Sequence, residues 1–364
     1  MNSLALFRLP HATECLLVMQ AQGEPEELAS CAELTGRQGF VMAPFAPSAR
    51  QPVLLIRPDR ISRFSQDADE SVWQEMEQYA RLENGYTLHE HENDRHGDEH
   101  SRSDYHLDFS NFHAHLTNGD FQKLVLSRSV SLQPRPELSP VSLFRLACRR
   151  YPRMCISLVY TPKSGLWMAA TPETLLSGED GHWHTVALAG TMNYADNLRW
   201  SDKNIQEQRY VATYITRTLE RFTADFSEEG PLTVRAGHLA HLRSDFHFTL
   251  PPDTPIGSLL QALHPTPAVC GLPKEPAFRF IRQYEHHERS YYSGFMGPLE
   301  VERQTHLFVT LRCMQLSARG YRLYAGGGLL KDSDEEQEWL ETEAKLDTMR
   351  NLLSDIPCTA TKRM

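Results

Sequence analysis

Apolar residues along the chain recur with two different periods, and together these predict a mixture of strands and helices. Short apolar runs bounded by turn residues at 14–19, 39–42 and 52–57 predict strands near the N-terminus. Further strands are predicted at 121–132, 154–160, 165–170, 184–191, 232–248, 291–300, 306–316 and 320–326. Helical periods occur at 105–120, 139–150, 202–222, 256–263, 275–289 and from about 334 onward. Regular βαβ units are missing, so we predict an α+β fold with a large, mainly antiparallel sheet.

Residues 66–105 interrupt this pattern with a polar, acidic stretch. It contains a run rich in histidine and carboxylates that includes His89, His91, His96 and His100. The run is either a solvated linker or a loose binder of a transition metal, and the lack of the fixed spacing of a zinc site favours the linker. We expect 1–105 to form an N-terminal scaffold portion of one fold, including this His-rich linker, and 106–356 to form its core.

The last predicted helix carries charges on its apolar side. Ser333 followed by Glu336 matches a capping box, so the helix should begin near residue 334. On a helical wheel, Glu338, Glu341 and Lys345 then point where the core should lie. Buried lone charges cost several kcal/mol each, so each needs a partner. An internal Glu341–Lys345 pair at i, i+4 leaves Glu338 unexplained, whereas a divalent cation with oxygen ligands accounts for both glutamates.

The helix predicted at 202–222 repeats this anomaly. Glu207 falls on the same side of the wheel as Tyr210, Val211 and Tyr214. Two helices that each offer an inward-facing glutamate can meet at one ion.

Composition narrows the class of protein. The chain has 364 residues, of which 40% are hydrophobic and 23% charged, as is ordinary for a folded soluble protein. A formal charge of −10 without a basic, aromatic-rich cluster argues against a nucleic-acid partner. No apolar stretch is long enough for a membrane span, and the N-terminus lacks the features of a signal peptide. Seven scattered cysteines without a CxxC motif favour free thiols, and with them a cytoplasmic location.

Several separate blocks of the chain resemble the chorismate-utilising enzymes. The blocks are Lys123-Leu-Val-Leu-Ser-Arg128, Thr171-Pro-Glu173, Leu188-Ala-Gly-Thr191, Lys203-Asn-Ile-Gln-Glu207, His241-Leu242, His264-Pro-Thr-Pro-Ala268, Tyr292-Ser-Gly294, Leu311-Arg312, Gly326-Gly-Gly328, and Glu338-Trp-Leu-Glu341 with Lys345. That family includes isochorismate synthases, salicylate synthases, anthranilate synthase component I and aminodeoxychorismate synthase. The resemblance covers roughly 110–350 and implies large, mainly antiparallel sheets flanked by helices around a central active-site cleft, with 106–356 as the chorismate-binding catalytic core.

A few positions indicate the branch of the family. Ala189 stands where the aminodeoxychorismate enzymes have a nucleophilic lysine, and Lys123 stands where ammonia-adding enzymes usually have glutamine. Lys123 therefore resembles the water-adding branch. Within it, the alanine at 268 resembles isochorismate synthases, whereas salicylate synthases often have threonine there. A salicylate synthase and a non-catalytic chorismate-binding protein remain the alternatives.

Four residues depart from the family pattern. Gln208 replaces a histidine, Asn204 an acidic residue, Gly327 an alanine and Cys270 a small residue.

The resemblance implies an acid–base pair for adding water at C2 of chorismate and expelling the C4 hydroxyl. Lys123 would be the general base and Glu173 the general acid that protonates the leaving hydroxyl. This requires a lowered pKa for Lys123 and a raised pKa for Glu173. Taken alone, Lys123 also fits an exposed edge-strand lysine, and Glu173 also fits an N-terminal charge of a helix.

The resemblance also implies how the two carboxylates of chorismate are bound. Mg²⁺ held by Glu207 and Glu341, and by Glu338 directly or through water, would take the ring carboxylate, with Lys345 beside it. The implied substrate-binding positions are Gly190, Thr191, His241, Ala268, Tyr292, Arg312, Gly326, Gly328 and Lys345. Arginine suits a forked carboxylate contact, and glycine admits a close backbone approach. His241 is either a carboxylate-orienting group or a satisfied core histidine. We expect chorismate as the small-molecule partner, no nucleic-acid or membrane partner, and a monomer or weak dimer.

Overall fold

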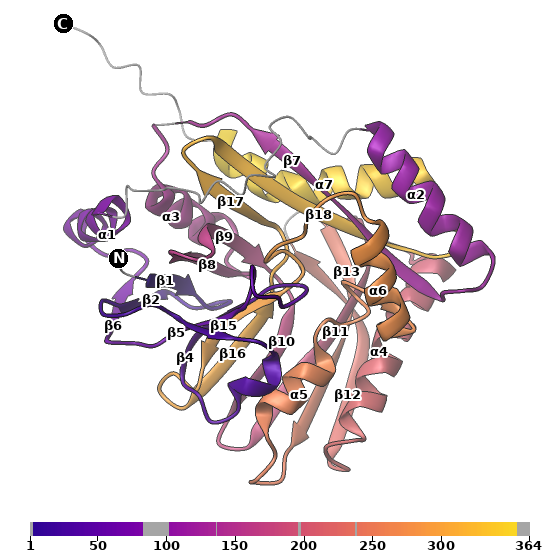
Figure 1. Ribbon diagram of the computed structural model, residues 1–364, viewed down its shortest axis with the longest axis horizontal. Coiled ribbons are helices and arrows are strands. Elements are labelled where there is room, and N and C mark those ends of the chain that lie inside the picture. Colours follow the sequence, from indigo (N-terminus) through magenta and orange to yellow (C-terminus); the bar gives the residue numbers. More distant parts are fainter. Residues whose placement is uncertain (1–2, 83–101, 136, 196–197, 237–238, 355–364) are drawn as a thin grey trace, which may run out of the picture.

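The computed structural model describes residues 3–82, 102–135, 137–195, 198–236 and 239–354. Figure 1 shows two sheets surrounded by helices. In spatial order, sheet A contains β14 (Gly271–Leu272), β7 (Lys123–Leu132), β18 (Gly320–Leu329), β17 (Cys313–Ser317), β9 (Gly165–Thr171), β8 (Cys155–Thr161), β1 (Ser3–Arg8), β2 (Glu14–Gln20) and β6 (Arg60–Ser65). Sheet B contains β12 (Phe226–Ala236), β13 (Leu239–Thr249), β11 (His182–Asn193), β10 (Thr174–Glu179), β16 (Gln304–Val309), β15 (Phe295–Leu299), β4 (Gly39–Ala43), β5 (Val53–Ile56) and β3 (Glu26–Leu28).

Every pairing described between these strands is antiparallel, which confirms the predicted α+β fold. The helical elements are η1 (Cys31–Leu34), α1 (Glu70–Leu82), α2 (Arg102–Thr117), α3 (Pro140–Arg150), α4 (Asp202–Leu219), α5 (Ile256–Leu263), α6 (Lys274–Tyr284) and α7 (Glu335–Ser354). None of them, within the part of the chain just given, is long and apolar enough to span a membrane.

Hydrophobic packing arranges these elements in four layers. Helices α3 and α7 pack on the outer face of sheet A, and α4 and α5 pack on the outer face of sheet B. A third cluster, which includes Phe7, Phe40, Trp167 and Tyr324, fills the space between the two sheets. Because successive residues of a strand face opposite sides, β7 sends Lys123 and Val125 inward while Arg128 faces α7. Sheet A thus presents the charged side chain of Lys123 to the interior, in addition to this apolar cluster.

The two sheets are joined at a corner by two adjacent segments of the chain. Strand β9 of sheet A leads through Pro172 and Glu173 into β10 of sheet B. Strand β16 of sheet B leads through residues 310–312 into β17 of sheet A. The amide of Val309 donates to the carbonyl of Glu173 at 3.0 Å, so the two crossings lie side by side. Arg312 adopts a φ of 46°, a left-handed conformation that turns the chain between the sheets.

This corner corrects the strand predicted at 306–316, which is two strands in different sheets. Apolar residues continue at alternate positions across the break, at Val309, Leu311 and Cys313, so the hydrophobic period gives no sign of it. The polar stretch at 66–105 also begins with a helix, α1, which the sequence did not predict; its Trp73 and Met76 are buried against α3. The helix predicted at 275–289 ends at Tyr284. The His-rich run at 88–100 lies outside the described residues.

The N-terminus of α7 differs from the predicted capping box. Asp334 caps the helix by accepting a hydrogen bond from the amide of Gln337 at 3.1 Å. Ser333 instead accepts from the amide of Leu330 and donates to Glu338 Oε1 at 2.7 Å. The serine therefore holds an inward-facing carboxylate.

Candidate active site

A cleft of about 620 Å³ lies between the two sheets, beside the corner where the chain crosses from one to the other. Its walls come from β7 and β18 of sheet A, β11 and β13 of sheet B, both crossing segments, and helices α4 and α7. The predicted site residues that line it are Glu173, Gly190, Thr191, Glu207, His241, Ala268, Tyr292, Arg312, Gly326, Gly328 and Lys345. The remaining three, Lys123, Glu338 and Glu341, adjoin it through the contacts described next. The fold therefore brings all of the predicted positions to one place.

The three glutamates predicted to hold a metal are each paired with a lysine. Lys123 Nζ lies 2.9 Å from Glu207 Oε1, and the lysine side chain is fully buried. Lys345 Nζ donates to Glu341 Oε1 at 2.7 Å and to the carbonyl of Gly326 at 2.8 Å. The i, i+4 pair predicted within the last helix is thus present.

Lys203 pairs with the third of these glutamates, Glu338. Lys203 is on the first turn of α4 and Glu338 on the first turn of α7, so the contact ties the two helix starts together across the end of sheet A. Lys203 was not among the predicted site residues. It lies four residues before Glu207, on the same helix face, and this spacing could have indicated that Lys203 belongs to the same site.

Glycines on β18 let these carboxylates approach the sheet from both sides. A Cβ on Gly328 would overlap Glu207 Oε1 and lie 2.9 Å from Lys123 Cε. On the opposite face, a Cβ on Gly327 would lie 3.1 Å from Glu338 Oε2, with Glu341 Oε1 at 3.9 Å. Successive residues of a strand face opposite sides, so Gly328 lies against Glu207 of α4 and Gly327 lies against the glutamates of α7.

Burial and charge give the carboxyl groups of the site different proton affinities. Burial raises the pKa of Glu173 to about 8, although Lys123, Lys345 and Arg312 oppose the shift. Burial acts on Glu207 as well, but there Lys123 and Lys203 prevail and its pKa falls below the ordinary value. Glu173 therefore holds a proton at neutral pH while Glu207 is ionised, which is the separation that acid–base chemistry needs.

Glu338 differs from Glu207 although both are buried. Burial and the nearby Glu341 raise the pKa of Glu338 to about 7, against the opposing effect of Lys203 and Ser333. Its Oε2 atom is buried without a hydrogen-bond partner. Such an atom is costly unless something else engages it.

His241 and Arg312 form a fixed pair in the wall of the cleft. Arg312 donates from a guanidinium nitrogen to Nε2 of His241 at 2.6 Å, and Nδ1 of the histidine lies 3.1 Å from the carbonyl of Gly190. Nδ1 must then carry the hydrogen, and His241 is a neutral acceptor. Burial and the charge of Arg312 hold the pKa of His241 well below its ordinary value, consistent with this tautomer. His241 thus orients the arginine.

Burial acts on Arg312 as well and lowers its pKa to about 10, so it stays cationic at neutral pH. Tyr292 lies nearby, with its hydroxyl 2.7 Å from where a Cβ of Gly326 would be. The guanidinium, the phenol and the glycine backbone line the same part of the cleft. This group suits a carboxylate.

Two residues that depart from the family pattern support the cleft wall. The pairing of β11 with β13 is irregular between Ala189 and Thr191, and Gly190 adopts a φ of 68°. The amide of Ala189 donates to Gln208 Oε1 at 2.9 Å, and Gln208 Nε2 donates to the carbonyl of Ala187 at 3.0 Å. Asn204 lies under Gly190, 3.2 Å from where a Cβ would be. Gln208 thus satisfies two backbone groups of β11 next to the bulge.

The donor atoms are all carboxylate oxygens and suit a hard divalent cation such as Mg²⁺, although the oxygens of the three glutamates do not all lie within 4.8 Å of one another. Three carboxylates approach from α4 and α7, a buried oxygen of Glu338 lacks a partner, and glycines leave the strand between them bare. A cation here would replace lysine contacts, because each glutamate is already paired with an ammonium group.

The chain belongs to the family described as chorismate binding enzymes, whose pattern residues 56–354 match. It is 32% identical over 250 residues to the isochorismate synthase MenF of Escherichia coli K12, covering 65% of this chain and 57% of that protein. It is 33% identical over 264 residues to the salicylate biosynthesis isochorismate synthase of Pseudomonas aeruginosa PAO1, covering 66% and 52%. The match thus spans little more than half the length of these relatives.

Two solved structures share the fold. A putative 2,3-dihydroxybenzoate-specific isochorismate synthase, DhbC from Bacillus anthracis, aligns over 96% of both chains with a TM-score of 0.75 at 23% identity. Anthranilate synthase component I from Streptococcus pneumoniae aligns over 95% of this chain and 89% of its own, with a TM-score of 0.67 at 18% identity. At these identities the similarity establishes the architecture.

The two neighbouring glycines of β18 give a direct test of the site geometry. We expect Gly328→Ala to destabilise the protein by about 2–3 kcal/mol, because its methyl group displaces the buried Lys123–Glu207 pair. Gly327→Ala is the matched control and should cost less than about 1 kcal/mol, because its methyl group meets only the edge of a glutamate. Urea unfolding measures both. Equal effects would contradict the placement of Glu207 against β18.

Proposed function

We propose that the protein is an isochorismate synthase that adds water at C2 of chorismate and expels the C4 hydroxyl. One observation carries this proposal. Glu173, whose carboxyl is protonated at neutral pH, and the buried Lys123 lie beside a single cleft, close enough for the charge of the lysine to act on the carboxyl. The similarity to isochorismate synthases supports the same activity.

Glu173 supplies the proton. Hydroxide is a poor leaving group, so the C4 oxygen must be protonated as its bond to carbon breaks. The carboxyl lies at the corner between the sheets, with its backbone held by the amide of Val309. Glu173 is only 2% exposed, so bulk water does not compete for the proton.

Lys123 takes the proton from water on the other side of the ring. Its ammonium group contacts Glu207, and its long stem lies beside Gly328 on the inner face of sheet A. Lys123 acts as a base only as the neutral amine. Glu207 has two roles in this proposal: it is the ion-pair partner of Lys123 and a ligand of the proposed Mg²⁺.

The two carboxylates of chorismate are bound at two ends of the cleft. Arg312, oriented by His241, and Tyr292 take the enolpyruvyl carboxylate beside the glycine backbone. Glu207, Glu338 and Glu341 would hold Mg²⁺, which would supply positive charge for the ring carboxylate. The remaining walls, Gly190, Thr191 and Ala268, bound the ring itself.

The product would feed menaquinone synthesis, siderophore synthesis or another pathway. The related proteins include MenF of Escherichia coli, a menaquinone-specific isochorismate synthase, and a vibriobactin-specific isochorismate synthase. Both share the same reaction, so the site chemistry does not depend on this choice.

The protonated state of Glu173 predicts a pH profile. Below a pKa of about 8 the carboxyl can donate its proton, and above it the group is ionised, so turnover should fall as pH rises through about 8. Glu173→Gln keeps the shape and should lower kcat by about 10²–10⁴-fold at all pH values. The residual activity should also lack the alkaline fall. An alkaline fall that persists unchanged in Glu173→Gln would show that another group supplies the proton.

Lys123→Gln tests both the base and the branch of the family. We expect it to abolish water addition while calorimetry still detects chorismate binding, because the carboxylate contacts remain. Combining it with Glu173→Gln should add little further loss, since neither half of the reaction proceeds alone. Lys163→Gln, a surface lysine paired with Glu27, is the control and should leave turnover unchanged.

Product chromatography completes that test. Isochorismate is expected from the unaltered protein, whereas salicylate and pyruvate would identify a salicylate synthase. Near-native turnover by Lys123→Gln would overturn the base assignment. Parallel loss of binding and catalysis would make Lys123 a substrate anchor instead.

A further inference from the structure

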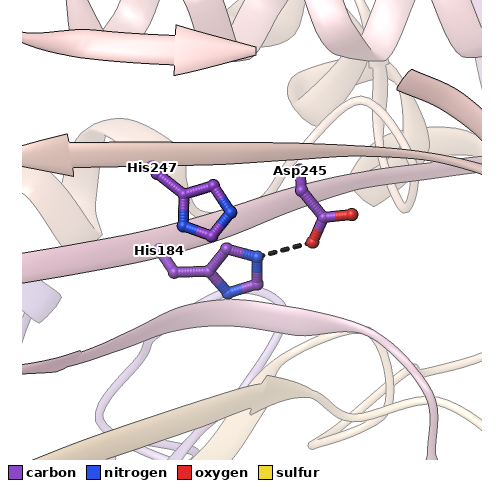
Figure 2. Close-up of side chains that lie close together, drawn as sticks. All are labelled: His184, Asp245 and His247. Atoms are coloured by element: carbon purple, nitrogen blue, oxygen red, sulfur yellow. Dashed lines mark hydrogen bonds and ion pairs between the residues drawn. The ribbon is translucent and has the colours of Figure 1, made fainter. Parts of the chain in front are cut away.

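Three side chains gather on sheet B, apart from the cleft. His184 of β11 and Asp245 and His247 of β13 place ligand atoms within 4.8 Å of one another, as Figure 2 shows. Among the residues that the structure describes, no other group of three or more histidine, cysteine and carboxylate side chains places its ligand atoms this close together. The three glutamates of the cleft are not such a group.

Strand register creates the cluster. His184 and His247 are direct cross-strand partners, and Asp245, two residues before His247, lies on the same face. The imidazole centroids are 4.8 Å apart with the rings inclined by 30°. On the opposite face, Phe246 and Phe248 are buried in the core of sheet B. That burial fixes the register, because a one-residue slip would expose both phenylalanines.

The cluster is already held in a near-ligating arrangement. Nε2 of His184 lies 2.6 Å from Asp245 Oδ1. Arg243 donates through Nε to both oxygens of Asp245 at 3.0 and 2.9 Å, and this orients the carboxylate from behind. Carboxylate ligands of metals are commonly supported by such outer hydrogen bonds. The positive charge of Arg243 lowers the affinity expected of the site without removing a ligand.

Asp245 is the carboxylate of the cluster. Burial opposes ionisation of Asp245, but hydrogen bonds from His184 and Arg243 outweigh it and hold its pKa well below the ordinary value. The carboxylate is therefore negative at neutral pH. His184 is about a quarter exposed and His247 is open to solvent, so an ion has an entry path and room for water ligands.

We propose that His184, Asp245 and His247 form a binding site for a borderline divalent transition-metal ion, with Zn²⁺ as the ion its ligands fit best. Two imidazole nitrogens and one carboxylate oxygen are a ligand set that Zn²⁺ accepts, with water in the fourth position, whereas Mg²⁺ prefers oxygen alone. The bound ion takes the place of the proton shared by His184 and Asp245. It links β11 to β13, the strands that also carry Gly190 and His241 of the cleft.

The site is independent of the proposed activity, because none of its ligands lines the cleft. His241 and His247 share one face of β13, six residues apart, with Arg243 between them. An ion at the cluster therefore stabilises the strand pair without competing for the glutamates.

The test is calorimetric titration of Zn²⁺ into a full-length background variant. The background replaces His89, His91, His96 and His100 with alanine, since that run offers imidazoles of its own. Excess Mg²⁺ is included to occupy the glutamates of the cleft. We expect one Zn²⁺ per chain, and a rise in the thermal unfolding midpoint on adding Zn²⁺.

Variants of the cluster decide the outcome. Adding His247→Ala or Asp245→Asn to the background should weaken Zn²⁺ binding at least about tenfold and remove the rise in midpoint. His247 is exposed, so its loss should leave folding intact, and circular dichroism checks this. His106→Ala, an exposed histidine of α2, is the control and should change neither quantity. Absence of Zn²⁺ binding in the background, or full binding in both cluster variants, would overturn the proposal.

Discussion

Three glutamates and three lysines, paired one to one, are the constraint on which the interior of this protein depends. Glu207, Glu338 and Glu341 come from two helices on opposite layers, and their ammonium partners come from α4, α7 and β7. Removing one member of a buried pair costs about 3–5 kcal/mol, because its partner is left charged and desolvated. The pairs therefore hold α4, α7 and sheet A in one relative position. They also leave the cluster close to neutral, so a further divalent cation needs negative charge from elsewhere. The two carboxylates of chorismate would supply it.

The corner between the sheets supplies the other half of the site. A sandwich of two sheets normally fills its interior with apolar side chains. At this corner two adjacent segments of the chain cross between the sheets, and each delivers a charged group, Glu173 on one and Arg312 on the other. Backbone hydrogen bonds join the crossings, so Glu173 and Arg312 are fixed to each other. Burial then raises the pKa of Glu173 to about 8, while Arg312 stays cationic.

Much of this arrangement could be predicted from local patterns. Glu338, Glu341 and Glu207 stood out because carboxylates on the apolar side of a helix require partners, and the Glu341–Lys345 pair followed from its spacing. Other features depend on contacts between distant segments. The pairing of Lys203 with Glu338 joins residues 135 positions apart. The role of Gln208 follows from a β-bulge at Gly190, and the corner at 310–312 interrupts no apolar pattern. Helix α1 was not predicted because its sequence is mostly polar and only a few of its residues are buried.

We propose that the paired glutamates hold Mg²⁺ together with the dianionic substrate. The most direct measurement is calorimetric titration of Mg²⁺ into the Glu173→Gln variant, which should turn chorismate over only slowly, with and without saturating chorismate. We expect chorismate to tighten Mg²⁺ binding about tenfold or more, and Mg²⁺ to tighten chorismate binding by the same factor. Glu341→Gln, added to that variant, should lose the effect, and EDTA should abolish turnover of the unaltered protein until Mg²⁺ is restored. Equal Mg²⁺ affinity in both titrations, or full turnover in EDTA, would contradict the claim.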